Sequence, residues 1–471
     1  MKIIESKDFD SYWKKESIQS EDLKTEKVVR NIIGQVRKNG DAAVRKFASK
    51  FDKSSPQKLE VPLSCAVQAL DELRKNDSAL TEALELAAQN IMSFSVKQRE
   101  QFKDFEYEID KGVITGQRII PVQRCAVYIP GGRFPLFSSV LMCMIPAFCA
   151  GVEEVILSSP PMLDGFPDKR TLAAAAIAAK ACGISLDTRQ QENRLRIFSI
   201  GGAQAIAALA LGTETVPRVD VIAGPGNKFV ATAKKILFGQ VGIDFIAGPT
   251  DVLIIAEPKQ TCQTADSKCE CDMEKAANLV AADMLAQAEH DPDARARALV
   301  PDKDFAQMIA NTIEERIENL STIKTAKASL DNGGLIIVYN EKEEAIRIAN
   351  TIAAEHLELH LDDYESWIPF LKNYGSLFIG CLSAEVLGDY SAGINHTLPT
   401  SASARFTGGL SVRHFLKTVT SLRCNINSGY EKICHAAEII GKAEGLDGHS
   451  QSAAVRNSVR DSIGDSVRKS N

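Results

Sequence analysis

The sequence predicts an α/β protein with two Rossmann-like, doubly wound units flanked by helical N- and C-terminal segments. Strand-like and helix-like segments alternate between residues 125 and 239, and a second alternation runs from 251 to 379. Several strands of the first series run into glycine-rich turns. Repeated units of strand, glycine turn and helix are typical of a parallel sheet covered by helices.

The first series begins with a short apolar segment that reads as a buried strand. Its expected strands are 125–129, 154–158, 196–200 and 219–223. They alternate with expected helices at 138–150, 171–182, 203–211 and 228–238. The first two helices stop at Gly151 and Gly183, and glycine commonly ends a helix.

The second series has the same alternation. Its expected strands are 251–256, 297–300, 334–338 and 375–379, and its expected helices are 274–290, 304–320 and 342–353. Residues 1–100 are expected to be helical, because apolar residues recur at spacings of three and four. From residue 412 onward we again expect helix, with a tail at 450–471 that frays.

Composition restricts the class of protein. The chain has 471 residues, a formal net charge of −6 and a pI near 5.8, so we expect neither nucleic acid nor an anionic membrane as partner. It has no run of about 18 apolar residues. Its first residues resemble neither a signal nor a transit peptide, which predicts a cytoplasmic protein. The odd number of cysteines, 11, argues against a disulfide framework.

The segment 257–275 reads as a loop that carries Cys262, Cys269 and Cys271. Three close cysteines could form a metal clip. Their spacing matches no common zinc pattern and the segment contains no histidine, so a solvated surface insertion is favoured.

The tripeptide Ala-Glu-His occurs twice, at 288–290 and 354–356. In the first copy, Gln287 and His290 are three residues apart and share a helix face, where they could bind zinc. The alternative is a histidine that caps the helix end. In the second copy, Glu355 and His356 lie where a sheet edge is expected to open. A turn there would let them act as a base and an acid.

Two later segments are also rich in polar residues. The segment 387–400 contains Asp389, Asn395 and His396 among turn-forming residues, and such loops often form the walls of sites. His449 follows Glu444 near the C-terminus, and a surface histidine is the simpler interpretation unless it has a partner. The glycine turns near 131, 201 and 224 follow strands, where open parallel sheets bind ligands, but none has the Gly-x-Gly-x-x-Gly pattern.

The order of these motifs resembles the histidinol dehydrogenase family. It runs Pro-Gly-Gly, Gly-Gly-Ala-Gln, Gly-Pro-Gly-Asn, Ala-Gly-Pro-Thr, Gln-Ala-Glu-His, Glu-His-Leu, Gly-Asp-Tyr-Ser-Ala-Gly and Asn-His-Thr-Leu-Pro-Thr over roughly residues 20–460. The resemblance implies an intertwined homodimer that binds Zn²⁺ and NAD. It also implies oxidation of an alcohol to an aldehyde and then to a carboxylate, as in histidine biosynthesis.

The resemblance also implies a role for each site residue. The implied zinc ligands are Gln287, His290, Asp389 and His449, and His449 and Glu444 would come from the other subunit. The implied acid/base pair is Glu355 and His356. The implied NAD contacts are Tyr128, Gln204 and Asn227. The implied substrate contacts are Thr250, His356, His396 and Glu444, together with the four zinc ligands.

We therefore expect four parts in the chain. They are a helical N-terminal segment at 1–24, an α/β domain with the metal and acid/base residues at 25–127 plus 251–410, a second α/β domain with the NAD contacts at 128–250, and a helical segment at 411–471 that reaches the partner subunit.

Some positions depart from the family pattern. Thr250 and Asp251 stand where the family usually has Ser and Glu, and 373–380 and 404–418 look more like a paralogous group that includes sulfopropanediol 3-dehydrogenases. The substrate is thus histidinol or another small polar alcohol such as 2,3-dihydroxypropane-1-sulfonate. Glu444 would favour a cationic amine, whereas Arg405 or Arg413 would favour a sulfonate. A third alternative, a non-catalytic binding protein on this fold, predicts the loss of a ligand, and all candidate ligands are present.

Overall fold

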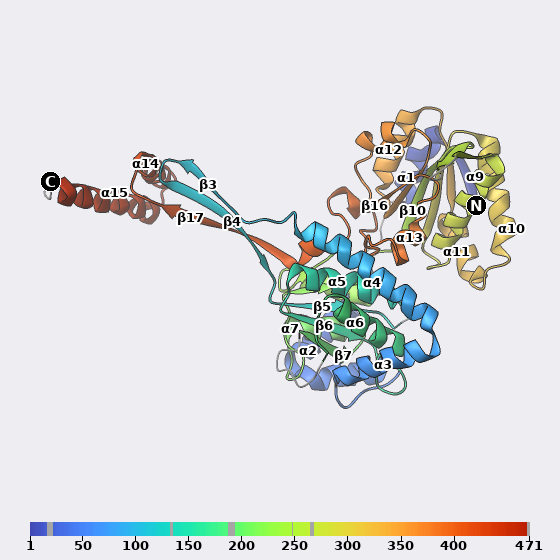
Figure 1. Cartoon of the computed structure of the whole chain (residues 1–471), viewed down its shortest axis with the longest axis horizontal. Helices are drawn as coiled ribbons and strands as arrows, with labels where there is room; N and C mark the ends of the chain where they lie inside the picture. The colour runs from blue at the N-terminus through green and yellow to red at the C-terminus, as the bar shows by residue number, and fades with distance from the viewer. Residues whose placement is uncertain (17–21, 132–134, 187–193, 247, 264–267, 469–471) are drawn as a thin grey trace. The chain divides into compact units, whose positions relative to one another are not determined.

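The computed structural model describes residues 1–16, 22–131, 135–186, 194–246, 248–263 and 268–468. Its chain forms two compact units, which are described separately. The first comprises Met1–Arg99 and Val122–Phe415, and the second comprises Glu100–Pro121 and Leu416–Asn471. Figure 1 shows the chain with many of its helices and strands labelled.

The first unit contains a parallel sheet, sheet A, with β10 in its interior. Its strand order is β1-β14-β13-β10-β15-β16. The strands are β1 (Lys2–Glu5), β10 (Asp251–Ala256), β13 (Arg295–Val300), β14 (Leu335–Val338), β15 (His356–His360) and β16 (Ser376–Ile379). All of its described pairings are parallel. Apolar residues dominate its inner strands because both faces of the sheet are covered.

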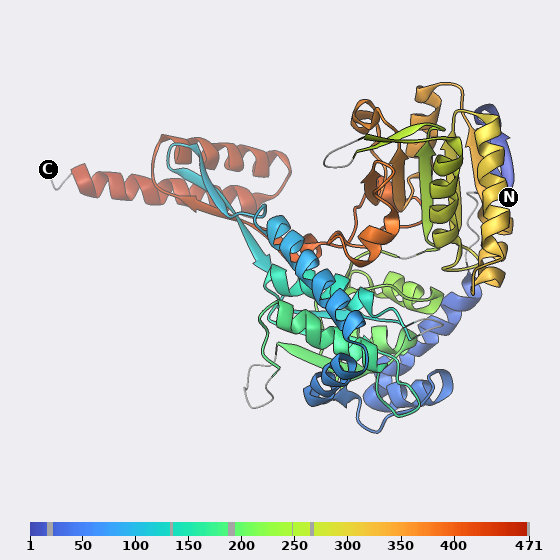
Figure 2. The same ribbon diagram turned by 45° about the vertical axis from the view of Figure 1, so that its right-hand side comes forward.

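Helices cover both faces of sheet A. One face packs on α9 (Met273–Ala288), α10 (Lys303–Ile317) and α11 (Ile323–Gly333), through an apolar cluster that includes Ile254 and Met284. The other face packs on α1 (Phe9–Glu16) and α12 (Lys342–Ile352), through a cluster that includes Phe9 and Leu359. Figure 2 shows α9 and α10 side by side against the sheet.

The same unit contains a second sheet, sheet B, with the order β2-β7-β6-β5-β8-β9. Its strands are β2 (Glu60–Val61), β5 (Arg124–Tyr128), β6 (Glu154–Ser159), β7 (Leu195–Ser199), β8 (Val221–Ala223) and β9 (Gly242–Ile243). Only β2 is antiparallel to its described neighbour. In both sheets the first strand of an αβ series lies centrally and the strand order reverses beside it, at β5/β8 and at β10/β15.

Seven helices accompany sheet B among the described residues. They are α2 (Leu23–Phe51), α3 (Leu63–Asn76), α4 (Ser78–Arg99), α5 (Ser138–Ala150), α6 (Lys169–Ala181), α7 (Gly202–Leu211) and α8 (Lys228–Leu237). Helix α5 is apolar around almost its whole circumference, since α4 and α6 both pack on it and on each other. The side chain of Asn227 caps α8 by accepting from the N–H groups of Phe229 and Val230.

The second unit is smaller and has an antiparallel sheet of β3 (Phe105–Asp110), β4 (Val113–Pro121) and β17 (Leu416–Cys424). Helices α14 (Ser428–Ala443) and α15 (Asp447–Arg468) follow and pack on each other. Among the described residues, no helix combines the length and the apolar character that a membrane-spanning segment needs.

The expectation of an α/β protein with parallel sheets is confirmed, and the helix at 138–150 and the strand at 251–256 have the expected bounds. Other expectations were wrong. Residues 2–5 form a strand within the expected N-terminal helical region, and 416–424 form a strand where helix was expected. Both strands pair with distant segments, β14 and β4, and this pairing outweighs local helical spacing. Strand β15, helix α11 (Ile323–Gly333) and helix α13 (Glu385–Tyr390) were not foreseen.

Two further differences concern the segments that flank the sheets. Helices α2, α3 and α4, from the segment 25–127, pack against α7, α6 and α5 of sheet B, and α4 also contacts the 251–410 part through the Asn90 amide, which donates to the Ser391 carbonyl oxygen. The expected loop 257–275 contains a hairpin of β11 (Gln260–Gln263) and β12 (Lys268–Cys271). The side chains of Cys262, Cys269 and Cys271 lie outside the described part, so the role of this insertion stays a prediction.

Candidate active site

Three predicted site residues and the neighbouring Asp251 lie at the amino edge of sheet A, where β10 and β15 run side by side. Thr250 precedes β10 and Asp251 opens it, while Glu355 precedes β15 and His356 opens it. The strands are parallel, with Val252 paired to His356. The register therefore brings together two segments that are about a hundred residues apart in sequence.

Glu355 is buried and held by three groups. The Thr250 hydroxyl and the Asp251 N–H, at 3.2 Å, donate to its Oε2, and its own N–H donates to Asp251 Oδ1 at 3.1 Å. Burial raises the pKa of Glu355 to about 7, although His356 and the Thr250 hydroxyl lower it. Two residues earlier, Ala353 has a left-handed φ of 51° where α12 ends and the chain turns towards β15. With a pKa of about 7, the Glu355 carboxyl titrates near neutral pH, where a general base is effective.

His356 is buried among carboxylates. Its Nδ1 lies 3.3 Å from the Asp251 carbonyl oxygen and 3.5 Å from Glu385 Oε2, and its Nε2 lies 3.5 Å from Asp389 Oδ1. Burial lowers the pKa of His356, but Glu385, Glu355 and Asp389 outweigh it and raise the pKa well above the ordinary value. Among the described residues, neither Nε2 nor Glu385 Oε2 has a hydrogen-bond partner. Both atoms are available to a ligand.

Two buried acidic residues of this edge, Asp251 and Glu385, were not assigned a role from the sequence. Asp251 Oδ2 lies 3.3 Å from Arg297 Nη1, and burial raises the pKa of Asp251. Glu385 begins α13, four residues before Asp389, so both can face the same side. That spacing was visible in the sequence, whereas the Arg297 contact depends on the pairing of β10 with β13.

Gln287 lies in the last turn of α9 and is buried. Its amide is 2.8 Å from Thr250 Oγ1. In the orientation that satisfies both ends of the amide, its oxygen also accepts from the Asp251 N–H at 2.8 Å and its nitrogen donates to Glu385 Oε1 at 3.1 Å. Gln287 therefore belongs to the same edge as Glu355 and His356.

The other predicted ligands of this unit lie around Asp389. His290 is exposed and lies just beyond the end of α9. Burial raises the pKa of Asp389, but His356, His396 and His290 outweigh burial and lower this pKa. His396 Nδ1 contacts the Asp389 carbonyl oxygen at 2.8 Å and its Nε2 contacts Ser139 Oγ at 2.9 Å. Burial lowers the pKa of His396, which favours a neutral imidazole.

Glu444 and His449 belong to the second compact unit. Glu444 follows α14 and His449 lies in the first turn of α15, and both are exposed. Their places beside the metal and the substrate therefore stay predictions.

The predicted NAD contacts lie at the carboxyl edge of sheet B. Tyr128 ends β5 and its hydroxyl accepts from the Gly202 N–H at 2.9 Å, while Gln204 lies in the first turn of α7. Asn227 is the exposed N-cap of α8. Gly224 must be glycine, since it has a φ of 112° and an added Cβ would lie 2.2 Å from the Tyr128 carbonyl oxygen.

Asp52 is a further residue of this carboxyl edge that the sequence did not indicate. Gln204 Nε2 donates to Asp52 Oδ2 at 3.3 Å. Burial raises the pKa of Asp52 to about 6, although the Gly201 N–H and Gln204 lower it. Its position after α2, which is kinked at Gly40, carries no motif, and only the packing of α2 on α7 brings it here.

Comparisons with known proteins agree with the order of the motifs. The family model described as histidinol dehydrogenase matches residues 14–457. The chain is 40% identical over 435 residues to the histidinol dehydrogenase of Aquifex aeolicus, covering 92% of each chain. It is 40% identical over 443 residues to that of Nitrosomonas europaea, covering 93% of this chain and 94% of the relative.

A solved structure is similar over almost the whole fold. The crystal structure of histidinol dehydrogenase from Elizabethkingia anophelis matches with a TM-score of 0.83 and 32% identity, covering 95% of this chain and 96% of that chain. The resemblance read from the motifs is thereby confirmed. The chain belongs to the histidinol dehydrogenase family and is an enzyme, an oxidoreductase.

Proposed function

We propose that the chain is a zinc-dependent enzyme that oxidises L-histidinol to L-histidine with two NAD, in histidine biosynthesis. The observation that carries the proposal is the buried pair Glu355 and His356 at the amino edge of β10 and β15, with Thr250, Gln287 and Asp389 around it. Two relatives that are 40% identical to this chain over more than nine-tenths of its length are named histidinol dehydrogenase.

The donor set fits a zinc ion. Gln287 lies in the last turn of α9, His290 lies two residues beyond the end of this helix, and Asp389 comes from α13, which contacts α9. An amide oxygen, an imidazole and a carboxylate are all zinc donors, although glutamine is uncommon. We propose that His449 from the second subunit of a homodimer completes the set, with Glu444 beside the substrate. When bound, zinc would orient the substrate by binding its imidazole and amine.

In the first oxidation, we propose that His356 accepts the proton of the substrate hydroxyl while a hydride passes to NAD. This step turns the alcohol and one NAD⁺ into an aldehyde, NADH and a proton. Asp251 and Glu385 contact the Nδ1 side of the ring, and Nε2, which has Asp389 Oδ1 at 3.5 Å, would face the substrate.

In the second oxidation, Glu355 accepts a proton from the water that adds to the aldehyde, and the hydrate then loses its hydride to a second NAD⁺. The products are the carboxylate and a second NADH. A carboxyl with a pKa of about 7 is suited to this task because it is a stronger base than an exposed glutamate and is still about half ionised near neutral pH.

For NAD we propose contacts with Tyr128, Gln204 and Asn227 at the carboxyl edge of sheet B. This edge has the strand reversal at β5/β8 where open parallel sheets bind ligands. The helix N-termini of α7 and α8 follow there, and such ends favour the anionic pyrophosphate.

One assay tests the substrate. NADH formation is followed with L-histidinol and, in parallel, with 2,3-dihydroxypropane-1-sulfonate. We expect turnover of L-histidinol with about two NADH for each substrate consumed, as two hydride transfers require. Turnover of the sulfonate alone would reject histidinol and leave the oxidation chemistry. No turnover of either substrate by zinc-loaded protein would reject the proposed function.

A further inference from the structure

The polar groups of sheet A continue beyond the catalytic pair. Along β15, His356, Glu358 and His360 alternate with the buried Leu357 and Leu359. Successive strand residues face opposite sides of a sheet, so the three polar residues line one face. The leucines belong to the core on the α12 side, which places the polar row on the α9 side.

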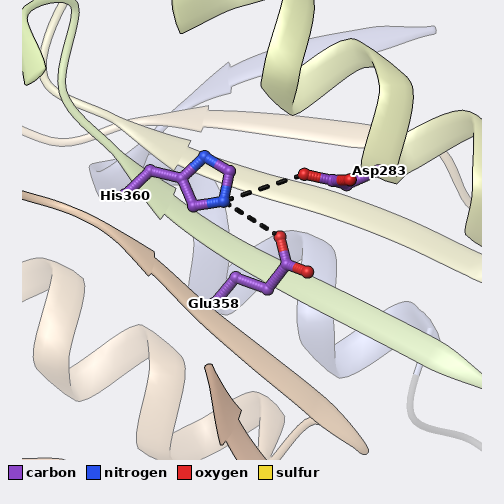
Figure 3. A group of neighbouring side chains, drawn as sticks. All are labelled: Asp283, Glu358 and His360. Atoms are coloured by element: carbon purple, nitrogen blue, oxygen red, sulfur yellow. Dashed lines mark ion pairs between the residues drawn. The ribbon is translucent and has the colours of Figure 1, made fainter. Parts of the chain in front are cut away.

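Helix α9 presents a matching row. Asp283 and Gln287 are four residues apart, about one turn, and therefore share a face. Gln287 meets the catalytic end of the strand row through Glu385 and Thr250. Asp283 meets the other end, where Glu358 and His360 lie, and Figure 3 shows the three side chains converging between α9 and β15.

We propose that Asp283, Glu358 and His360 form a second divalent-cation site, separate from the zinc ligands proposed above. One ligand atom of each lies within 4.8 Å of the others. His360 Nε2 is 3.2 Å from Glu358 Oε2 and 3.7 Å from Asp283 Oδ2. Donors bound to a tetrahedral zinc at about 2.0–2.2 Å are about 3.4 Å apart, so these separations suit a shared ion.

The burial of these groups supports the site independently. Glu358 and His360 are 0% exposed and Asp283 is 8% exposed. Among the described residues, His360 Nδ1 and Nε2 and Glu358 Oε2 have no hydrogen-bond partner. Buried polar atoms without partners are costly, and an ion that binds Nε2 and Oε2 would remove part of that cost.

The surroundings hold the ligands in place and provide the charge that a cation needs. Glu358 Oε1 accepts from the Glu385 N–H at 2.7 Å, which leaves Oε2 directed to His360. Burial and then the Glu358 carboxylate raise the pKa of Asp283 to about 8. Asp283 is the most exposed of the three residues, so an ion would enter the site from its side.

An ion here would link α9 to β15 one turn from the catalytic end, and would hold Gln287 and His356 in register. The choice of ligands, one imidazole and two carboxylates, suits zinc and similar transition ions better than magnesium or calcium. The site goes beyond the proposed oxidation, which needs only the first ion.

The test is the zinc content of the full chain, loaded with Zn²⁺ and desalted, by mass spectrometry of the metal. Wild type should hold about two zinc ions per chain. His360→Gln and Asp283→Asn should each lose about one, and His290→Gln should lose the other. The exposed His435→Gln is the matched control and should keep both.

A second measurement protects the test against a variant that folds poorly. Zn²⁺ should raise the melting temperature of His290→Gln, and this shift should disappear when His360→Gln is added, because only ions that bind the folded state stabilise it. A His360→Gln variant with the zinc content of wild type would overturn the proposal, whether wild type holds one zinc ion per chain or two. Loss of zinc from His360→Gln but not from His290→Gln would reject the first metal site and keep this one.

Discussion

In sheet B, the residues proposed to bind NAD follow the carboxyl ends of β5, β7 and β8. In sheet A, the proposed acid/base residues precede or open the amino ends of β10 and β15. The two sheets nevertheless have the same central arrangement, with a reversal of strand order at β5/β8 and at β10/β15. Strand order therefore locates a site along the sheet, but it does not decide which edge carries the chemistry.

The two edges also differ in what builds them. Glycine turns and helix N-termini form the carboxyl edge of sheet B, and its backbone groups suit an extended anionic cofactor. Buried carboxylates and imidazoles form the amino edge of sheet A, where burial raises the pKa of Glu355 to about 7 and the surrounding carboxylates raise the pKa of His356. The first edge is suited to binding and the second to proton transfer, and four substitutions can test this difference.

The largest effect is expected from His356→Asn at the amino edge of sheet A. Loss of the proposed base should lower kcat by about 10²–10⁴-fold with L-histidinol, while NAD affinity changes little. Steady-state kinetics and a nucleotide titration measure the two quantities, and the exposed His435→Gln serves as control. Unchanged kcat would remove His356 from the mechanism and the proton chemistry from this edge.

Glu355→Gln should mainly slow the second oxidation. We expect a fall of about 10²-fold in turnover of the aldehyde, because the proposed base for water is lost while its shape is kept. The ratio of NADH to histidinol consumed should then fall toward one, and a carbonyl trap should capture the aldehyde. A ratio that stays near that of wild type contradicts the assignment.

At the carboxyl edge of sheet B, Gly224→Ala should weaken NAD binding and stability together. An added Cβ would meet the Tyr128 carbonyl oxygen at 2.2 Å, at a φ of 112°. Gly239→Ala is the matched control, since Gly239 also has a positive φ, 93°, but no atom within 4 Å of an added Cβ. Relative to this control we expect a further loss of about 1–3 kcal/mol in unfolding free energy, measured with urea. Equal losses of unfolding free energy in Gly224→Ala and Gly239→Ala would show that the Cβ added at Gly224 does not displace Tyr128.

The smallest effect is expected from Asp52→Asn. Because the pKa of Asp52 is raised to about 6, its charge appears as pH rises through 6 and should repel the NAD pyrophosphate. NAD should bind the variant about twofold more tightly at pH 8 and equally at pH 5. The same raised pKa means that the protonated carboxyl of Asp52 favours the folded state. This contribution to the free energy of unfolding is fully present below the pKa that Asp52 has in the unfolded chain, and it is lost as pH rises through 6. The exposed Asp71→Asn should change neither quantity.

Local pattern was sufficient for much of the fold. The helix at 138–150 and the strand at 251–256 were predicted correctly because an apolar run, a terminal glycine and a turn act within a few residues. The motifs likewise indicated the family, since the glycine turns and the Glu-His pairs keep their chemistry wherever the chain places them.

Only the tertiary structure decided what is adjacent to what. The strand β1 depends on β14, more than 300 residues away, and β17 depends on β4, so local helical spacing was misleading at both. The placement of Glu355 and His356 at an amino edge follows from the register of β15 on β10.

The sequence by itself determined the parallel αβ series, the family and the chemical types available for the site. It did not determine that Asp251 and Glu385 surround His356, or that Asp283 meets Glu358 and His360 between α9 and β15. The physical reason is that residue types and local propensities act over a few positions. Burial, pKa and ligand geometry depend on partners that only the pairing of distant strands and helices supplies.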